Sequence, residues 1–185
     1  VEVGLLAGYP TVADALTRLP PGPVRVVPFF MEDGYFVRSV IPPLLPPHAA
    51  LGEPVGTHPS VADIAAALVP SDASDLVLIA HGSARNPGRR LAAHTHTETL
   101  RHRFGSARLG FLEEAPFAAD VLRAARGDKV AVVGMFAGEG GHPSDDLPAL
   151  LAHSPRLLWA GSIGAHPAMA DLIADRATSA GRRLP

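Results

Sequence analysis

Three short polar motifs in the second half of the chain carry the side chains best suited to chemistry. His81 lies in residues 79–83 (IAHGS), Glu113 and Glu114 lie in residues 111–114 (FLEE), and His142 lies in residues 140–148. Imidazole is the commonest metal ligand in proteins and also a base near neutral pH. A carboxylate beside it can neutralise charge or supply a further ligand. The residue types therefore indicate metal binding combined with proton transfer.

Buried strands separated by helices are expected to position these motifs. Short apolar segments at 24–30, 75–80, 129–134 and 156–160 are typical of strands covered on both faces. Residues 11–19, 88–104, 117–126 and 167–180 predict helices, the second with Asn86 as its N-cap and Pro87 at its first position. This alternation predicts an α/β fold in which parallel sheets are flanked by helices. Because the carboxyl ends of parallel strands share one edge, we expect the three motifs to converge on one cleft.

The chain repeats itself at an interval of about 106 residues. Residues 3–16 match 109–122, residues 30–42 match 136–148, and residues 56–64 match 164–172 at an interval of 108. Three ordered matches predict two similar lobes, a degenerate one over residues 1–70 and a complete one over 71–185 that carries the site. Residues 76–104 have no counterpart in the first lobe. We therefore expect the first lobe to lack its first strand and helix, and the chain to lack the start of the natural protein.

A histidine after a strand is more often a polar loop residue than a functional one. The repeat argues against that interpretation here. The first-lobe positions that match Glu113 and His142 hold Ala7 and Phe36, so the scaffold recurs and the polar set does not. A residue needed only for the scaffold should recur with it.

The remaining histidines fit structural or solvated positions better than a site. His58 and His166 recur at matching positions, each before a Pro at a helix start, and we interpret them as mainly structural. His94, His96 and His102 share one predicted helix, where a solvated helix face is the better interpretation.

Composition excludes several classes of function. The 185 residues contain no Cys, which excludes thiolate zinc sites and cysteine nucleophiles. The net charge of −2 argues against nucleic-acid binding, and no apolar run is long enough to span a membrane, so we expect a cytoplasmic protein. Lys129 does not lie in a phosphate-binding loop and Ser83 lacks a nucleophile elbow, which disfavours a nucleotide cofactor and a serine hydrolase.

Arginines follow the first motif closely. Arg85, Arg89 and Arg90 lie on the loop and first helical turn after His81. They fit a solvated helix start, although positive charge there opposes the helix dipole. Binding of an anion near the cleft would explain why they are tolerated.

The motifs resemble those of the class II chelatases, of the CbiX and sirohydrochlorin chelatase type. The resemblance rests on residues 78–83, 111–113 with Pro116, 141–142 with 146–148, and 164–167, in the family's order. The family usually places its Glu four residues before this Pro. Here Glu113 lies three residues before Pro116, so Glu114 stays a rival. In the two-half relatives the active residues usually lie in the first half, whereas here they lie in the second.

The resemblance implies a two-lobed chelatase fold that inserts Co²⁺ or Fe²⁺, with Ni²⁺ as a third candidate, into sirohydrochlorin or a related tetrapyrrole without ATP. It implies that His81 and His142 bind the metal and accept protons and that Glu113 assists them. The tetrapyrrole's peripheral carboxylates need donors, for which bidentate arginines are suited. The substrate-binding candidates are Ser83, Arg85, Arg89 and Gly141, with Arg90 and Arg38 as further arginines.

Two other functions stay open at this point. A carrier of metal or tetrapyrrole on the same fold would bind tightly without turnover, and an interaction domain would bind no cobalt. A fold alone does not separate these functions. Homo-oligomerisation also stays open.

Overall fold

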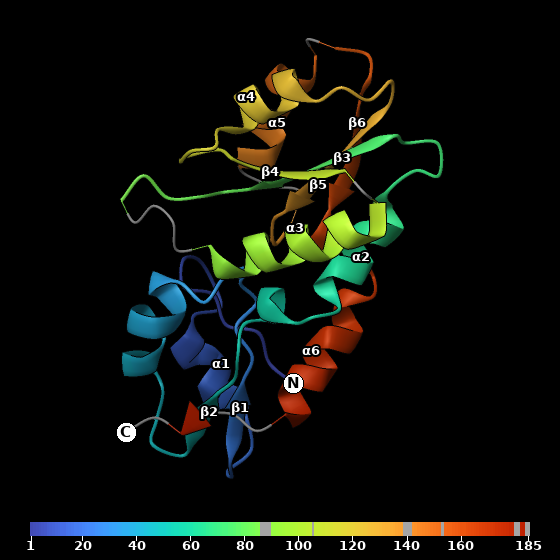
Figure 1. Cartoon of the computed structure of the whole chain (residues 1–185). Coiled ribbons are helices and arrows are strands. Elements are labelled where there is room, and N and C mark those ends of the chain that lie inside the picture. The colour runs from blue at the N-terminus through green and yellow to red at the C-terminus, as the bar shows by residue number, and fades with distance from the viewer. Residues whose placement is uncertain (86–89, 105, 139–141, 153, 180–181, 184–185) are drawn as a thin grey trace.

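The computed structural model describes residues 1–85, 90–104, 106–138, 142–152, 154–179 and 182–183, with the backbone alone for 142–146 and 182–183. Figure 1 shows the larger sheet in the upper half of the molecule and the smaller sheet in the lower half, with α3 and α2 between them. The predicted α/β class with helix-flanked parallel sheets is confirmed.

The larger sheet carries the polar motifs. It contains β3 (Asp75–Ala80), β4 (Ala107–Phe111), β5 (Val130–Met135) and β6 (Leu157–Ser162), all parallel, in the order β4-β3-β5-β6. Each residue of β3 and β5 is buried, as expected for strands covered on both faces. Since β3 lies between β4 and β5, the three strand ends that precede the polar motifs are neighbours.

Helices cover this sheet on both faces (Figure 1). Leu76 and Leu78 of β3 pack in one core with residues of α2 (Val61–Leu68) and α3 (Leu91–Phe104). Val77 and Ile79, which alternate with them, pack in a second core with residues of α4 (Ala118–Ala124) and α5 (His142–Leu151). Successive residues of a strand point to opposite faces of the sheet, so β3 contributes side chains to two separate cores.

The smaller sheet takes two of its three strands from residues 1–70, the predicted first lobe. β1 (Val24–Val26) pairs in parallel with β2 (Ala49–Leu51), and the C-terminal strand β7 (Arg182–Arg183) adds to β2 in antiparallel orientation. The other first-lobe elements are α1 (Val12–Arg18), the π-helical turn η1 (Phe36–Val40), and the 3-10 turns η2 (Pro42–Leu44) and η3 (Val55–Thr57). η4 (Ile163–Ala165) and α6 (Met169–Thr178) follow the larger sheet in the chain, and β7 comes after them.

Segments that match in the sequence make matching contacts. The N–H of Leu5 donates to the Pro10 carbonyl at 2.8 Å. The N–H of Phe111, 106 residues later, donates to the Pro116 carbonyl at 2.9 Å. These contacts agree with the sequence repeat, while the division of the chain near residue 70 stays a prediction.

Two predicted elements differ from the structure by three or more residues at one end. The strand expected over 24–30 ends at Val26, two residues before Pro28, which has no N–H to donate to a sheet. The helix expected over 88–104 begins at Leu91, and its expected cap at Asn86 and Pro87 lies outside the described residues. The carboxylate of Glu32, from the first lobe, accepts hydrogen bonds from the first turn of this helix.

Candidate active site

His81 and Glu113 meet at the carboxyl edge of the larger sheet. The Glu113 N–H donates to the His81 carbonyl at 3.0 Å, which extends the pairing of β3 and β4 by a further residue. The two side chains consequently lie on neighbouring strand ends. Nδ1 of His81 and Oε2 of Glu113 are 3.6 Å apart, with the side chains 44% and 42% exposed. An imidazole and a carboxylate at this spacing, both open to solvent, can hold a divalent cation or pass a proton.

Glu114 has a different environment from its neighbour in the chain. Its side chain is 4% exposed, and Oε1 accepts a hydrogen bond from the Ser83 N–H at 2.9 Å. The same oxygen lies 3.2 Å from Nε of Arg90. Glu114 therefore holds the loop after His81 from beneath, and Glu113 is the one of the two that faces His81.

Gly82 lets that loop pass over Glu114. Its φ is +76°, a conformation that favours glycine. A Cβ at this position would lie 2.9 Å from Cγ of Glu114 and 3.0 Å from Cβ of Phe111. The glycine of the His-Gly-Ser motif is thus explained by backbone conformation and by close packing together.

The third motif follows β5. This strand ends at Met135, which is paired with Ala80 of β3, and the chain enters α5 at His142. The side chain of His142 lies outside the described part of the structure, as do Gly141 and Arg89 as whole residues. The structure thus brings His81 and Glu113 together. His142 is the first residue of the helix that follows the neighbouring strand.

The arginines proposed as substrate donors differ in how exposed they are. Arg85 is exposed, so its guanidinium is open to an anionic ligand. The Arg90 side chain is 12% exposed and forms an ion pair with Glu114 in the protein interior. Arg38 of the first lobe lies 2.9 Å from Asp33 and is 59% exposed.

The contacts of His58 and His166 agree with the mainly structural role predicted for them. Nδ1 of His58 accepts the Ser60 N–H at 3.1 Å, and Nδ1 of His166 accepts the Ala168 N–H at 3.2 Å. Each ring thus satisfies a backbone donor at a helix start, which is why the pair recurs with the scaffold.

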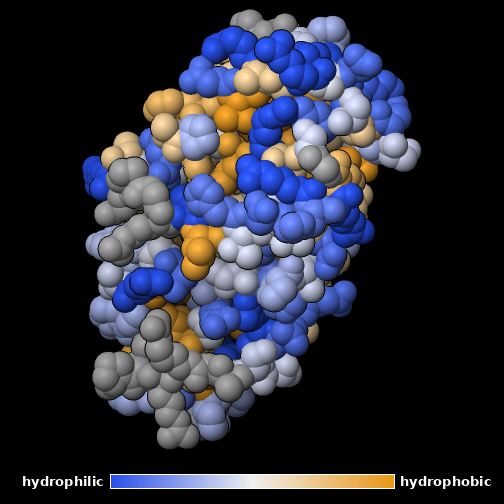
Figure 2. Space-filling model, in the orientation of Figure 1, coloured by the Kyte–Doolittle hydropathy of each residue, from blue (hydrophilic) through white to orange (hydrophobic). Residues whose placement is uncertain are grey.

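The interpretation of His96 as a solvated residue is wrong. The hydrophilic outer face of α3 crosses the middle of Figure 2, but His96 lies on the inner face and is 2% exposed. Its Nε2 donates to the Gly56 carbonyl at 2.8 Å. Burial lowers the pKa of His96 from its ordinary value, and the hydrogen bond to Gly56 opposes this. One face of the predicted helix packs against the first lobe. The sequence alone did not identify that His96 lies on this face.

A metal site of three or more ligands is absent among the His, Asp and Glu side chains that the structure describes. His81 and Glu113 are two candidate ligands, and the undescribed His142 side chain is a third. A site with few protein ligands keeps open positions for exchange.

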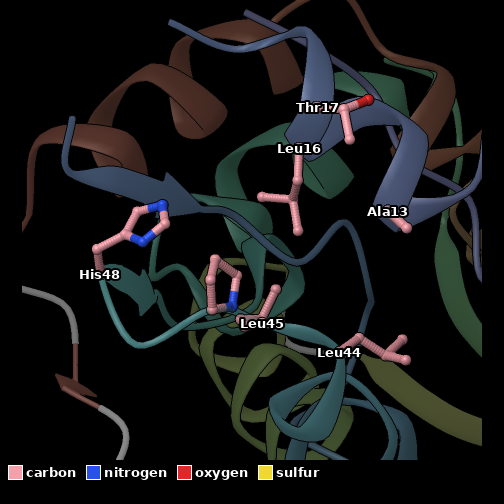
Figure 3. A pocket seen from close by; sticks show the side chains of 7 residues that line it. Ala13, Leu16, Thr17, Leu44, Leu45 and His48 are labelled. Atoms are coloured by element: carbon pink, nitrogen blue, oxygen red, sulfur yellow. The ribbon is translucent and has the colours of Figure 1, made fainter. Parts of the chain in front are cut away.

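An apolar pocket of about 440 Å³ lies elsewhere, between α1 and the segment around η2 (Figure 3). Its lining residues are Ala13, Leu16, Thr17, Leu44, Leu45, Pro46 and His48. None of them belongs to the three polar motifs, so this pocket is separate from the candidate site. Along the described stretches, no helix is both long and apolar enough to cross a membrane.

Comparisons with known proteins place this geometry in a family. The CbiX family model matches residues 75–180, the part that carries β3 to α6. A Halobacterium salinarum protein named probable sirohydrochlorin cobaltochelatase is 26% identical over 226 residues, covering 93% of this chain and 77% of that protein.

Solved structures agree with the sequence comparisons. A CbiX structure, described as that of the terminal enzyme for biosynthesis of siroheme in denitrifying bacteria, is 31% identical with a TM-score of 0.76, covering 90% of this chain and 80% of that one. The sirohydrochlorin chelatase SirB from Bacillus subtilis subspecies spizizenii, in complex with cobalt, is 18% identical with a TM-score of 0.75, and shares the fold over 95% of this chain and 78% of that one. Since the family model matches more than half of its residues, the chain belongs to the CbiX family.

Proposed function

We propose that this protein is a metal chelatase that inserts Co²⁺ or Fe²⁺ into sirohydrochlorin or a closely related tetrapyrrole. The observation that carries the proposal is the half-exposed His81–Glu113 pair, 3.6 Å apart at the carboxyl edge of the sheet. Membership of the CbiX family and the names of its relatives support this reaction and substrate. The metal is a substrate here, and Ni²⁺ is a further candidate.

The reaction needs a site that holds an ion loosely and takes up protons. Metal insertion forms bonds from the ion to the ring nitrogens and releases two pyrrole N–H protons. In our proposal, His81 and His142 carry the ion and accept these protons in turn, because neutral imidazole can do both. Glu113 orients the His81 ring and offsets the charge of the incoming cation.

The tetrapyrrole brings negative charge of its own. Its peripheral carboxylates suit donors on the segment that follows His81, where Arg85 is exposed. We assign substrate binding to Ser83, Arg85, Arg89 and Gly141. No nucleotide takes part in the proposed reaction, because the ion and the ring exchange ligands without phosphoryl transfer.

The test is an insertion assay with sirohydrochlorin and either Co²⁺ or Fe²⁺, followed by the change in tetrapyrrole absorbance. Wild type should turn over, and H81A should not. The matched control is H102A, which removes an imidazole whose side chain is 81% exposed on α3. Equal rates for H81A and wild type would remove His81 from the site. Tight Co²⁺ binding without turnover in wild type would favour a carrier, for which the comparisons give no support.

A further inference from the structure

A carboxylate of the first lobe binds the start of α3, the helix that follows His81 in the chain. Glu32 accepts the N–H of Ala92 at 3.2 Å on Oε2 and the N–H of Ala93 at 2.8 Å on Oε1. Both donors belong to the first turn of α3 and have no partner within the helix. The negative charge also suits the positive end of the helix dipole. A residue from about 60 positions upstream thus helps to fix where α3 begins.

Glu114 holds the beginning of the loop after His81. Its buried carboxylate accepts the Ser83 N–H at 2.9 Å and pairs with Arg90 at 3.2 Å. Arg90 directly precedes α3, so the ion pair joins the residue after Gly82 to the residue before the helix. Ser83, which follows Gly82, and Arg90, which precedes α3, are therefore both bound to one buried carboxylate.

The start of α3 brings the two carboxylates to one place in the chain. Arg90, which pairs with Glu114, lies two residues before Ala92, whose N–H donates to Glu32. Burial raises the pKa of Glu32, while the hydrogen bonds from Ala93 and Ala92 and the positive charge of Arg90 lower it. Arg90 keeps its partner only while Glu114 stays in place, and an unpaired buried charge is costly.

We propose that Glu32 and Glu114 are positioning residues, which together fix Ser83 and the start of α3 on either side of the residues that follow His81. This inference rests on the proposed function for its consequence, the placement of the His81 ring. It gives the first lobe, which lacks the polar motifs, a part in the reaction. It also assigns Glu114 a role distinct from that of Glu113.

A purely structural role is the competing explanation, because Glu32 also joins the lobes. The chain contains a matched control for this. Glu53 of the first lobe pairs with Arg176 of α6 at 2.6 Å and likewise crosses between the halves. E53Q therefore removes an inter-lobe charge pair without touching the site segment.

The first readout needs neither metal nor activity. Hydrogen exchange of the Ser83 amide, followed by NMR, reports the Glu114 hydrogen bond, while the Val132 amide in the buried strand β5 reports global opening. We expect E32Q to speed Ser83 exchange several-fold relative to Val132. E53Q should leave this ratio at the wild-type value. An unchanged ratio in E32Q overturns the proposal.

The second readout is Co²⁺ affinity, titrated by absorbance with the metal alone. Loss of residues that position a ligand typically weakens metal binding about 10-fold or more. We expect E32Q and E114Q each to lose about that factor, and the double variant to lose less than the product, since both hold the start of α3. A full product would show that the two residues act separately and would overturn their joint role. If wild type binds Co²⁺ but inserts none, the chelatase function fails and the positioning roles stand.

Discussion

Oε2 of Glu113 lies 3.6 Å from Nδ1 of His81, and the two residues belong to adjacent strand ends rather than to one segment. Their contact depends on the register of β3 and β4, because Ala80 pairs with Phe111 and the chain continues in step for two more residues. A shift of one residue would direct Glu114 toward the His81 side of the edge. The alternative between the two glutamates is therefore a matter of strand register.

Exchanging the two carboxylates for amides should separate their roles. E113Q should lower the insertion rate about 10- to 100-fold with an unchanged Tm, because the side chain is half exposed and touches His81. E114Q should lower Tm, because a buried partner of Arg90 loses its charge. Insertion assays and thermal unfolding of both variants check this. A stable E113Q enzyme with wild-type rate would favour Glu114 as the assisting carboxylate.

His142 should be as important for turnover as His81. H142A should reduce insertion at least about 100-fold, the usual contribution of a positioned acid–base group. The fold should survive, because His142 is the first residue of α5 and alanine is well tolerated in a helix. Circular dichroism and the absorbance assay check the two parts. A wild-type rate in H142A would leave His81 and Glu113 to act without a second imidazole.

A side chain at position 82 should destabilise the protein. G82A places a Cβ 2.9 Å from Cγ of Glu114 at a φ of +76°, so the loop must shift. We expect a loss of about 1–3 kcal/mol in unfolding free energy, typical of a strained backbone position. Weaker Co²⁺ binding should accompany it. Denaturant unfolding is the measurement, and G138A, whose Cβ would meet nothing within 4 Å, is the control.

The buried strands and the strand-end site could be predicted because they depend on local pattern. Residues 75–80 were expected as a strand and form β3 with the same bounds, and residues 129–134 differ from β5 by a single position. The meeting of His81 and Glu113 followed from parallel strand order alone. These features need only an apolar run, a turn residue and the rule that parallel strands end together.

The contacts between the lobes could not be predicted, because they join residues with no spacing signal. Glu32 and Ala93 are 61 residues apart, and His96 and Gly56 are 40 apart. His96 and Glu32 therefore looked like ordinary polar residues in the sequence. Helix α5 was also missed, since Pro148 inside it favours a loop.

Asp75 should make the protein sensitive to strong acid. Burial acts to raise its pKa, but hydrogen bonds from Ser106, Arg108 and the Leu76 N–H outweigh it, so the folded pKa lies below the ordinary value of 3.8. Such a group stabilises the fold above its unfolded pKa, and this stability is lost as pH falls through the folded pKa. D75N should therefore be less stable than wild type at pH 7, with a smaller difference near pH 3.

Urea unfolding of wild type and D75N across that range checks the acid prediction. D72N serves as the control, because Asp72 pairs with Lys129 at an exposed position where an ion pair contributes little. A constant difference between D75N and wild type at all pH values would show that the carboxylate's charge is not what stabilises the edge of β3.

His96 should make the protein less stable in mild acid. Burial lowers its pKa below 6.5, the nearby His58 adds to this, and the hydrogen bond to Gly56 opposes it. The folded protein then binds fewer protons than the unfolded chain, so the stability is complete above the unfolded pKa and is lost as pH falls below about 6.5. H96Q keeps a side-chain N–H for the Gly56 carbonyl and cannot titrate. Its free energy of unfolding should change less between pH 7 and 5 than that of wild type, while H102Q, at an exposed position on the same helix, should follow wild type. Parallel curves for H96Q and wild type would mean that His96 does not carry the acid sensitivity of the contact between α3 and the first lobe.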